Sequence, residues 1–258
     1  MRIGICEWSA MAGGEELFRR LQRTGLLGVQ VSYETAGFVE KMERYVKWAE
    51  QYGVTLTSVG ANVFCDRPFF LPENAEWVKE TVADVCRGAA MTEAKLFHAP
   101  SFGASTVHTD EQRHQTAVAL QLMCDVAAAY GVTVGTENAL SLEENEQLLA
   151  AVNRPNLKMY FDTQNPETTS HPDAAAQATA FVSIIPEVHV KDCDETGRSV
   201  KLGTGVTGFE TTLGNLIRGG YDGWLHLENG YDKFADPEAA MIEEREGLEA
   251  ILERLCKK

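Results

Sequence analysis

Residues 186–192 of this chain read PEVHVKD, a short run of β-branched and alternating side chains that ends in charged residues. Seven further runs of this kind are spaced along the sequence, with longer stretches of helical pattern between them; they cover residues 2–8, 28–34, 55–63, 95–100, 132–138, 157–163 and 223–229. Strand-like runs that alternate with helical stretches are typical of βαβ units and a parallel sheet. Eight such runs predict an α/β protein with a closed (β/α)₈ barrel, the TIM barrel fold, rather than an open doubly wound sheet.

No break in the sequence divides this predicted barrel. Ser141 begins Ser-Leu-Glu-Glu, a capping box, and Asp236-Pro237 is typical of an N-cap followed by proline at the first helical position. No linker rich in Pro, Gly or Ser interrupts the alternation, so we predict one domain over residues 1–258. Two long connections, residues 61–74 and 191–209, follow predicted strands and are expected at the catalytic end of the barrel.

The composition argues against nucleic acid and membranes as partners. The 258 residues are 44% hydrophobic, which is enough for a sizeable buried core. The chain carries 23 Lys and Arg against 38 Asp and Glu, and this net charge of -15 repels phosphate backbones and anionic lipid surfaces. No apolar stretch approaches the roughly 18 residues of a membrane span, and the N-terminus lacks the apolar core of a signal peptide. We therefore predict a soluble, cytoplasmic protein.

Motifs of several other classes are absent. The six cysteines are scattered without a Cys-x-x-Cys pair, which argues against zinc ribbons and thioredoxin-like redox motifs. Most of them are expected to be small buried hydrophobic side chains. The Gly-Thr-Gly at residues 203–205 is too short to be a phosphate-binding loop of a known kind.

Four predicted strands end in side chains that can bind a metal ion, namely Glu137, Asp162, His189 and Glu228. In a barrel, alternate side chains of each strand point inward, and the carboxyl ends of all strands meet at one mouth. We therefore expect these four side chains to converge there, where the active sites of such barrels lie.

Three carboxylates and one imidazole make an oxygen-rich site with a single nitrogen. Such a site suits Mn²⁺, Mg²⁺ or Co²⁺ better than a thiolate-rich structural zinc site does. Without a cation, the three carboxylates would repel one another. The sequence thus predicts one divalent metal ion, with Mn²⁺ as the first choice and Mg²⁺, Co²⁺ or Zn²⁺ as alternatives.

The segments VHVKD (188–192), Gly-Arg (197–198), LGTG (202–205) and GYDGWLHLEN (220–229) follow one another in this order. In identity and order they are similar to segments of the xylose isomerase-like superfamily of sugar isomerases and sugar-phosphate epimerases, and the resemblance spans nearly the whole chain. It implies that Glu137 and Glu228 are both metal ligands and the catalytic acid/base pair. It also implies that Asp162 and His189 are mainly ligands.

The chemistry expected from this resemblance is proton transfer next to a carbonyl group. Such a proton is too weakly acidic for a side chain to remove unaided, and a Lewis-acidic cation would stabilise the enediolate charge. If the two glutamates face opposite sides of one carbon, removal and return of the proton invert it, which is epimerisation. Return to the neighbouring carbon is isomerisation, and the sequence does not separate the two.

Three positions depart from the family pattern. Gln30 in the second predicted strand stands where relatives often carry glutamate, and Thr204 stands where many have glutamate. Asn165 stands where some relatives place a histidine three residues after the ligating aspartate. None of these changes removes a proposed ligand, but each is expected to alter the substrate pocket.

Further residues at the same end of the strands are candidates for substrate contact: Arg198, Lys191, His98, Asn62 and Trp8, with Phe64 as a pocket wall. Lys191 could alternatively pair with Asp192 or Glu187, and Arg198 could be a solvated loop residue. Glu187 and His226 are expected one layer below the ligands, where they could orient them by hydrogen bonds.

Other functions remain open. The nearest alternative is a metal-dependent lyase of the same superfamily, such as an inosose dehydratase or a C-glycoside-cleaving enzyme. An apurinic endonuclease is less favoured, because its three-metal site needs additional histidines and the charge of -15 opposes DNA binding. A non-catalytic sugar-binding protein would not need all four metal-binding side chains. The expected partner is a small sugar, and a homo-oligomer is possible.

Overall fold

The computed structural model describes residues 1–168 and 172–257, and these form the expected (β/α)₈ barrel. Within them, nine strands make one parallel sheet in the order β6-β5-β4-β3-β2-β1-β9-β8-β7. The strands are β1 (Arg2–Cys6), β2 (Gly28–Ser32), β3 (Thr55–Gly60), β4 (Leu96–Pro100), β5 (Thr133–Glu137), β6 (Leu157–Met159), β7 (Phe161–Asp162), β8 (Glu187–Val190) and β9 (Trp224–Leu227).

The sixth predicted strand, residues 157–163, is two short strands in the structure. β6 pairs with β5, β7 pairs with β8, and Tyr160 lies between the two pieces. The change of partner therefore occurs within one extended segment. Because β6 and β7 are the two ends of the sheet and are consecutive in the chain, the sheet closes into a barrel.

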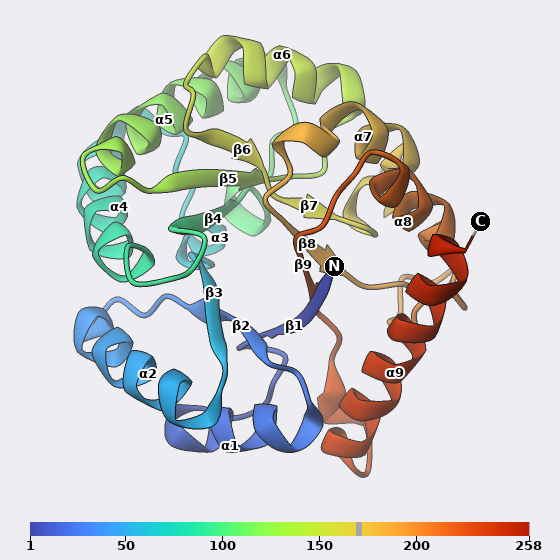
Figure 1. Ribbon diagram of the computed structural model, residues 1–258. Coiled ribbons are helices and arrows are strands. Elements are labelled where there is room, and N and C mark those ends of the chain that lie inside the picture. Colours follow the sequence, from blue (N-terminus) through green and yellow to red (C-terminus); the bar gives the residue numbers. More distant parts are fainter. Residues whose placement is uncertain (169–171, 258) are drawn as a thin grey trace.

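Helices surround the strands as an outer ring (Figure 1). The helices are α1 (Gly14–Thr24), α2 (Phe38–Tyr52), α3 (Val63–Asp66), α4 (Ala75–Ala89), α5 (Asp110–Ala128), α6 (Leu142–Val152), α7 (Ala174–Phe181), α8 (Phe209–Arg218) and α9 (Pro237–Cys256). Both predicted helix starts are confirmed: Ser141 forms a complete capping box, and the Asp236 side chain accepts from the Ala239 N–H. Local sequence thus determines where these helices begin.

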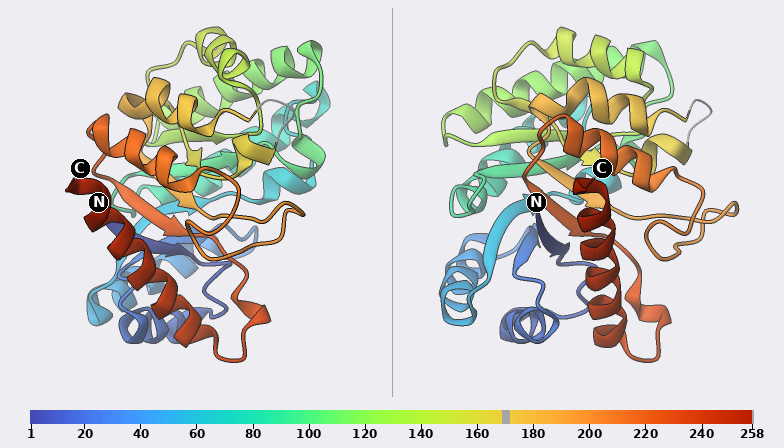
Figure 2. Two further views of the ribbon diagram at one scale, coloured as in Figure 1. Left: turned by 90° about the vertical axis from the view of Figure 1, so that its right-hand side faces the viewer. Right: turned by 45° about the vertical axis from the view of Figure 1, so that its right-hand side comes forward.

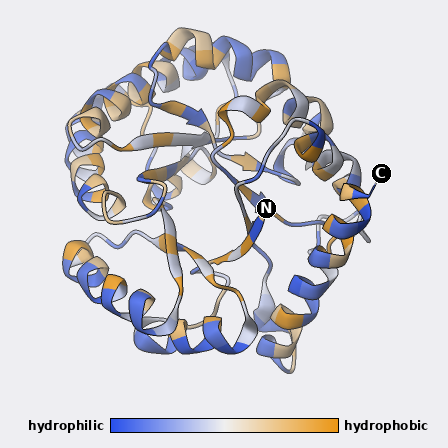
Figure 3. Ribbon diagram, in the orientation of Figure 1, coloured by the Kyte–Doolittle hydropathy of each residue, from blue (hydrophilic) through white to orange (hydrophobic). Residues whose placement is uncertain are grey.

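The hydrophobic core lies between the strands and the helices. Strand residues such as Val29 and Val134 and helix residues such as Leu17 and Met123 belong to one buried apolar cluster. The helices carry hydrophobic and hydrophilic residues along their length, as amphipathic helices of a barrel must (Figure 3). Several buried strand residues are instead polar, among them Gln30, Ser58, His98 and His226.

Two long connections lie at the end of the barrel opposite the N-terminus, as expected. Residues 61–74 contain α3 and a short 3₁₀ helix at Pro72–Asn74, and residues 191–208 project as an open loop (Figure 2). No helix within the described residues is long and apolar enough to cross a membrane. Four of the six cysteines are buried and all six are unpaired, which agrees with their expected role as small core residues.

Candidate active site

The four predicted ligands meet at the carboxyl ends of four strands. Glu137 ends β5, Asp162 ends β7, His189 lies in β8, and Glu228 directly follows β9. Nδ1 of His189 lies 3.5 Å from Oε1 of Glu137 and 3.4 Å from Oε2 of Glu228. Asp162 joins the group through Lys191, whose Nζ lies 3.0 Å from Asp162 Oδ2 and 2.6 Å from Glu228 Oε2. The structure therefore brings together the residues that the sequence selected.

Gln30 holds the ring of His189. Its Oε1 lies 2.7 Å from His189 Nε2, and its Nε2 donates to the hydroxyl of Ser58 at 3.1 Å. Because the amide nitrogen is engaged by Ser58, the amide oxygen faces the imidazole, and this assigns a proton to His189 Nε2. Nδ1 is consequently the atom that His189 presents to Glu137 and Glu228. Sequence reasoning noted Gln30 only as a departure from the family pattern.

Glu137 receives a hydrogen bond on each carboxylate oxygen. Nε2 of His98 lies 2.5 Å from Oε2, and Nδ2 of Asn165 donates to Oε1 at 2.9 Å. Burial opposes ionisation of Glu137, but His98 and His189 outweigh it and hold its pKa well below the usual range. Burial likewise lowers the pKa of His98, so a neutral imidazole donates to an ionised carboxylate. His98, a predicted substrate contact, thus lies directly against a predicted acid/base residue.

Glu228 is held by Trp8 and Lys191. Nε1 of Trp8 donates to Oε1 at 3.1 Å, and Lys191 Nζ donates to Oε2 at 2.6 Å. Burial opposes ionisation of Glu228, yet Lys191 and His189 lower its pKa. The indole fits because Gly60 has no side chain: a Cβ there would lie 2.6 Å from the ring of Trp8. Trp8, predicted as a substrate contact, therefore also positions a catalytic candidate.

Lys191 pairs with neither of the carboxylates that the sequence offered as alternatives. Those were Asp192 and Glu187, and the structure instead places the ammonium between Asp162 and Glu228. Burial disfavours its charged form, but the attraction of Asp162 and Glu228 outweighs burial and raises its pKa well above the usual value. The lysine is therefore a permanent positive charge inside the cluster.

Buried atoms without a hydrogen-bond partner show where a cation would fit. Within residues 1–168 and 172–257, these atoms include His189 Nδ1 and Asp162 Oδ2. The other Asp162 oxygen accepts from the backbone N–H of Gln164 at 2.7 Å and of Asn165 at 2.6 Å, and burial raises the pKa of Asp162 to about 6. Orphaned donor atoms among three carboxylates match the oxygen-rich set that a divalent cation prefers.

Cys6 and His98 also come within reach of this cluster. Ligand atoms of Cys6, His189 and Glu228 lie within 4.8 Å of one another, as do those of His98, Glu137 and His189. Burial raises the pKa of the Cys6 thiol to about 12, which keeps it protonated and a poor ligand for a hard cation. His98 Nε2 is engaged by Glu137, so neither residue replaces a member of the predicted set.

The layer below the ligands is polar but touches them only indirectly. Oε2 of Glu187 accepts from the Ser58 hydroxyl at 2.5 Å, and Ser58 connects through Gln30 to His189. The ring nitrogens of His226 lie 2.8 Å from the Thr57 hydroxyl and 3.3 Å from the Tyr160 hydroxyl. Glu187 reaches His189 only through Ser58 and Gln30, and His226 reaches Thr57 and Tyr160, so neither contacts a ligand directly and their expected orienting role stays a prediction. Burial raises the pKa of Glu187 to about 7.

Three other sequence candidates lie outside the cluster. The Arg198 guanidinium pairs with Asp194 at 2.9 Å and is 77% exposed. Asn62 is exposed just before α3, and Phe64 is fully buried against neighbouring aromatic rings. The Thr204 hydroxyl donates to the Lys201 carbonyl and not to any of the four predicted ligands. Their proposed contacts with substrate stay predictions.

The Gly-Thr-Gly segment is folded around Asp192. Oδ2 of Asp192 accepts from the N–H of Gly203 at 3.0 Å and of Gly205 at 2.8 Å, and Oδ1 accepts from the Thr207 hydroxyl at 2.8 Å. These donors could otherwise bind an external anion. The chain's own carboxylate fills that place, so this loop is organised by Asp192 and does not form a phosphate site. Sequence reasoning missed this role.

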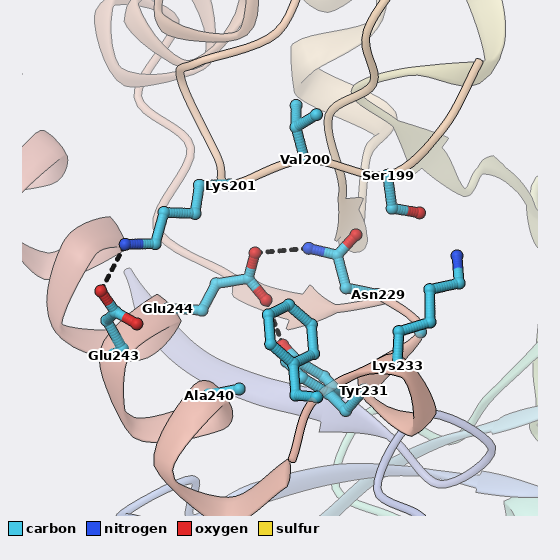
Figure 4. A pocket seen from close by; sticks show the side chains of 11 residues that line it. Ser199, Val200, Lys201, Asn229, Tyr231, Lys233, Ala240, Glu243 and Glu244 are labelled. Carbon is cyan, nitrogen blue, oxygen red and sulfur yellow. Dashed lines mark hydrogen bonds and ion pairs between the residues drawn. The ribbon is translucent and has the colours of Figure 1, made fainter. Parts of the chain in front are cut away.

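A small cavity of about 100 Å³ lies between residues 199–201, the segment that follows β9 and α9 (Figure 4). Its wall includes Glu244 of α9, which accepts hydrogen bonds from Asn229 and Tyr231. Burial raises the pKa of Glu244. None of the four predicted ligands lines this cavity. The hydrogen bonds of Glu244 instead connect the segment after Glu228 to α9.

Comparison with known proteins agrees with this architecture. The family model described as xylose isomerase-like TIM barrel matches residues 18–251. The 2-epi-5-epi-valiolone 7-phosphate 2-epimerase of an Actinoplanes species is 27% identical over 225 residues, which cover 84% of this chain and 82% of that protein.

Solved structures of sugar epimerases superpose on the whole barrel. L-ribulose 3-epimerase does so with a TM-score of 0.81 and 18% identity, over 99% of this chain and 96% of that one. The 3-keto-D-glucoside 4-epimerase from E. coli superposes with a TM-score of 0.78 and 16% identity, over 97% of this chain and 99% of that one. At these identities the likeness establishes the fold.

Proposed function

The chain belongs to the family of xylose isomerase-like TIM barrels, and from this membership we propose that it is a sugar epimerase or isomerase that uses one divalent cation. The substrate would be a ketose or a related small sugar. Support comes from the relatives, whose names describe an epimerase of 2-epi-5-epi-valiolone 7-phosphate and epimerases of sugars. The observation that carries the proposal is the placement of two glutamates within 3.5 Å of the same imidazole nitrogen.

The two glutamates are suited to hold and move a proton. Both are buried or nearly so and both are ionised; Glu137 ends β5 and Glu228 directly follows β9, and these two strands are not neighbours in the sheet. Donors on each carboxylate fix its direction, His98 and Asn165 for Glu137 and Trp8 for Glu228. In our proposal one carboxylate takes the proton next to the carbonyl group and the other returns it. Positioned acid/base groups of this kind typically add about 10² to 10⁴ in rate.

Glu137, Asp162, His189 and Glu228 would hold the cation. The fit rests on the three-carboxylate donor set and on two buried atoms that make no hydrogen bond, His189 Nδ1 and Asp162 Oδ2, the second of which is ion-paired with Lys191. When bound, the ion would supply Lewis-acid stabilisation of the negative charge that develops on the substrate oxygens. Mn²⁺ is our first choice, and Mg²⁺, Co²⁺ and Zn²⁺ are the alternatives to test.

Substrate hydroxyl groups would meet polar side chains around this centre. Lys191 and Trp8 border Glu228 and lie nearest to the cluster in the structure. We propose both as substrate contacts, with Asn62 and Arg198 as outer contacts on the two long connections. His98 is proposed to act through Glu137, because its Nε2 is already engaged there.

Incubation of the Mn²⁺-loaded protein with a panel of ketoses in D₂O tests the proposal. A glutamate that takes a proton from carbon can exchange it with solvent, so NMR should find deuterium next to the carbonyl in product or recovered substrate. An inverted centre identifies an epimerase, and a moved carbonyl identifies an isomerase. An unsaturated product would identify the lyase alternative.

Replacement of both Glu137 and Glu228 by Gln provides the control. Neither amide can act as a base, so exchange and turnover should both disappear. Exchange that survives the double replacement would exclude these residues as the proton-transfer pair. Absence of any reaction across the panel, with the metal shown to be bound, would contradict the proposed activity.

A further inference from the structure

The ammonium group of Lys191 lies where its charge compensates two of the proposed metal ligands. Its Nζ is 3.0 Å from Oδ2 of Asp162 and 2.6 Å from Oε2 of Glu228. The side chains of all three residues are largely buried, with 17% of Lys191 and 1% of Asp162 exposed. At this distance the three groups form an ion-paired unit inside the mouth of the barrel.

Lys191 contacts one oxygen of each carboxylate, and the other oxygen of each is held by a different donor; Glu228 Oε2 also lies 3.4 Å from His189 Nδ1. Asp162 Oδ1 is held by the backbone N–H groups of Gln164 and Asn165, and Glu228 Oε1 is held by Trp8. Oδ2 of Asp162 accepts no other hydrogen bond within the described residues. Lys191 thus neutralises the carboxylate oxygens that point into the centre of the cluster.

We propose that Lys191 is the resident counter-ion of this cluster and that it gives up the two carboxylates when a divalent cation binds. This inference rests on the proposed function only in that the cluster binds such a cation. It adds that one residue of the chain sets how tightly the cation is held. Lys191 keeps the ligand carboxylates together without the ion and weakens the binding of the ion by competing with it.

Competition follows from charge and space. An ammonium group and a divalent cation cannot both take the same inward-facing oxygens, and their positive charges repel each other at short range. Even with the strong screening found near protein surfaces, such repulsion corresponds to about a tenfold change in affinity or more. The lysine stem is flexible and not fully buried, so the ammonium can turn toward the mouth while the backbone of β8 stays in place.

Calorimetric titration with Mn²⁺ alone tests the inference on the full chain. Lys191→Met removes the charge and keeps most of the stem, and we expect it to bind Mn²⁺ about tenfold more tightly than the wild type, or more. Lys191→Arg keeps a charge and should not bind more tightly than the wild type. Lys201→Met is the matched control. Lys201 lies at the same end of the barrel but pairs with Glu243, so this substitution removes one positive charge without changing the cluster.

Thermal unfolding supplies a second readout on the same proteins. Without a divalent cation, Lys191→Met leaves the carboxylates of Asp162 and Glu228 uncompensated, so its midpoint should fall below that of the wild type. Added Mn²⁺ should then raise the midpoint of Lys191→Met more than that of the wild type, because ligand stabilisation grows with affinity. Lys201→Met should show the same Mn²⁺-induced increase as the wild type.

A measurement on the wild type keeps the inference testable if Lys191→Met does not fold. A buried, ion-paired lysine ammonium exchanges its protons slowly with water, and ¹⁵N NMR can detect it. The signal of Lys191 is assigned by its absence from the spectrum of Lys191→Arg. Addition of Zn²⁺ or Mg²⁺, which are diamagnetic, should abolish this signal in the wild type. Lys41 is the internal reference, since its ammonium is buried against Glu7 and Glu34 and should keep its signal.

The outcomes separate this inference from the proposed function. Mn²⁺ binding by the wild type with equal or weaker binding by Lys191→Met would overturn the inference and leave the metal site intact. A Lys191 ammonium signal that persists in the cation-saturated protein would overturn it as well. No cation binding by any variant would contradict both proposals.

Discussion

Nε2 of His98 lies 2.5 Å from Oε2 of Glu137, and both side chains are buried. His98 comes from β4 and Glu137 from β5, and the two strands pair in register so that His98 lies beside Gly135, two residues before the glutamate. The contact therefore follows from the pairing of two neighbouring strands. It makes His98 a positioning residue whose effect on catalysis would pass through the carboxylate.

We predict that His98→Phe lowers the rate of turnover about 10- to 100-fold, the usual effect of removing a group that orients a catalytic side chain. Loss of the donor should also raise the pKa of Glu137, because His98 is one of the groups that hold it down. The acidic limb of the pH–rate profile should then move to higher pH. His98→Gln, which can still donate to Glu137, should recover part of the rate, and an unchanged profile in His98→Phe would count against this role.

The four proposed ligands should divide into two classes. His189→Ala and Asp162→Ala remove groups whose proposed role is binding, so both should lose Mn²⁺ affinity in calorimetric titration. Glu228→Gln keeps one ligand oxygen and should retain some Mn²⁺, while turnover falls by about 10² to 10⁴ because the amide cannot accept a proton. A fully active Glu228→Gln protein would remove that residue from the acid/base pair.

Gly60→Ala should disturb the site through Trp8. The added methyl group would lie 2.6 Å from the indole, so the ring must move, and its 3.1 Å hydrogen bond to Glu228 should weaken. We expect a loss of stability of about 1 to 3 kcal/mol from overpacking and a fall in turnover of about 10- to 100-fold from misplacement of the carboxylate.

Two other variants check the route of this effect. Gly13→Ala places a methyl group where nothing lies within 4 Å, so it should leave stability and turnover close to wild type. Trp8→Phe removes the indole N–H and should reproduce the loss of turnover. If Gly60→Ala lowers turnover as much in the Trp8→Phe background as in the wild type, the effect does not pass through the hydrogen bond to Glu228.

The stability of the protein should depend on pH through Glu244. Burial raises the pKa of this carboxyl group in the folded protein, whereas in the unfolded chain it lies near 4.3. The folded state therefore binds the proton more tightly, and the stabilisation is complete below the unfolded pKa and is lost as pH rises through the folded pKa. Glu244→Gln cannot lose a proton, so its free energy of unfolding relative to the wild type should increase as pH rises.

Urea denaturation of both proteins between pH 4 and pH 8 measures this difference directly. The comparison cancels other titrating groups, because only Glu244 differs between the two chains. Curves that stay parallel over this range would show that burial of Glu244 does not shift its ionisation. Activity at saturating Mn²⁺ in Glu244→Gln would report whether the tie to Asn229 and Tyr231 also positions Glu228.

The strand pattern of the sequence determined the barrel and the convergence of the candidate ligands. Alternation along a strand is a local, period-two property, and the carboxyl ends of parallel strands must meet at one mouth. Glu137, Asp162, His189 and Glu228 could therefore be selected without coordinates. The same locality explains the correct helix starts at Ser141 and Asp236, where side chain and backbone interact within a few residues.

Only the tertiary structure decided which side chains hold these four. Trp8 and Glu228 are 220 positions apart, and Gln30 and His189 are 159 apart. Lys191 has several carboxylates nearby. The stagger of the strands around the barrel and the packing of each side chain decide which of them it contacts, and local periodicity encodes neither. Two further features depend on the packing of distant segments for the same reason. Asp192 accepts hydrogen bonds from the Gly-Thr-Gly segment, and the strand partner changes at Tyr160.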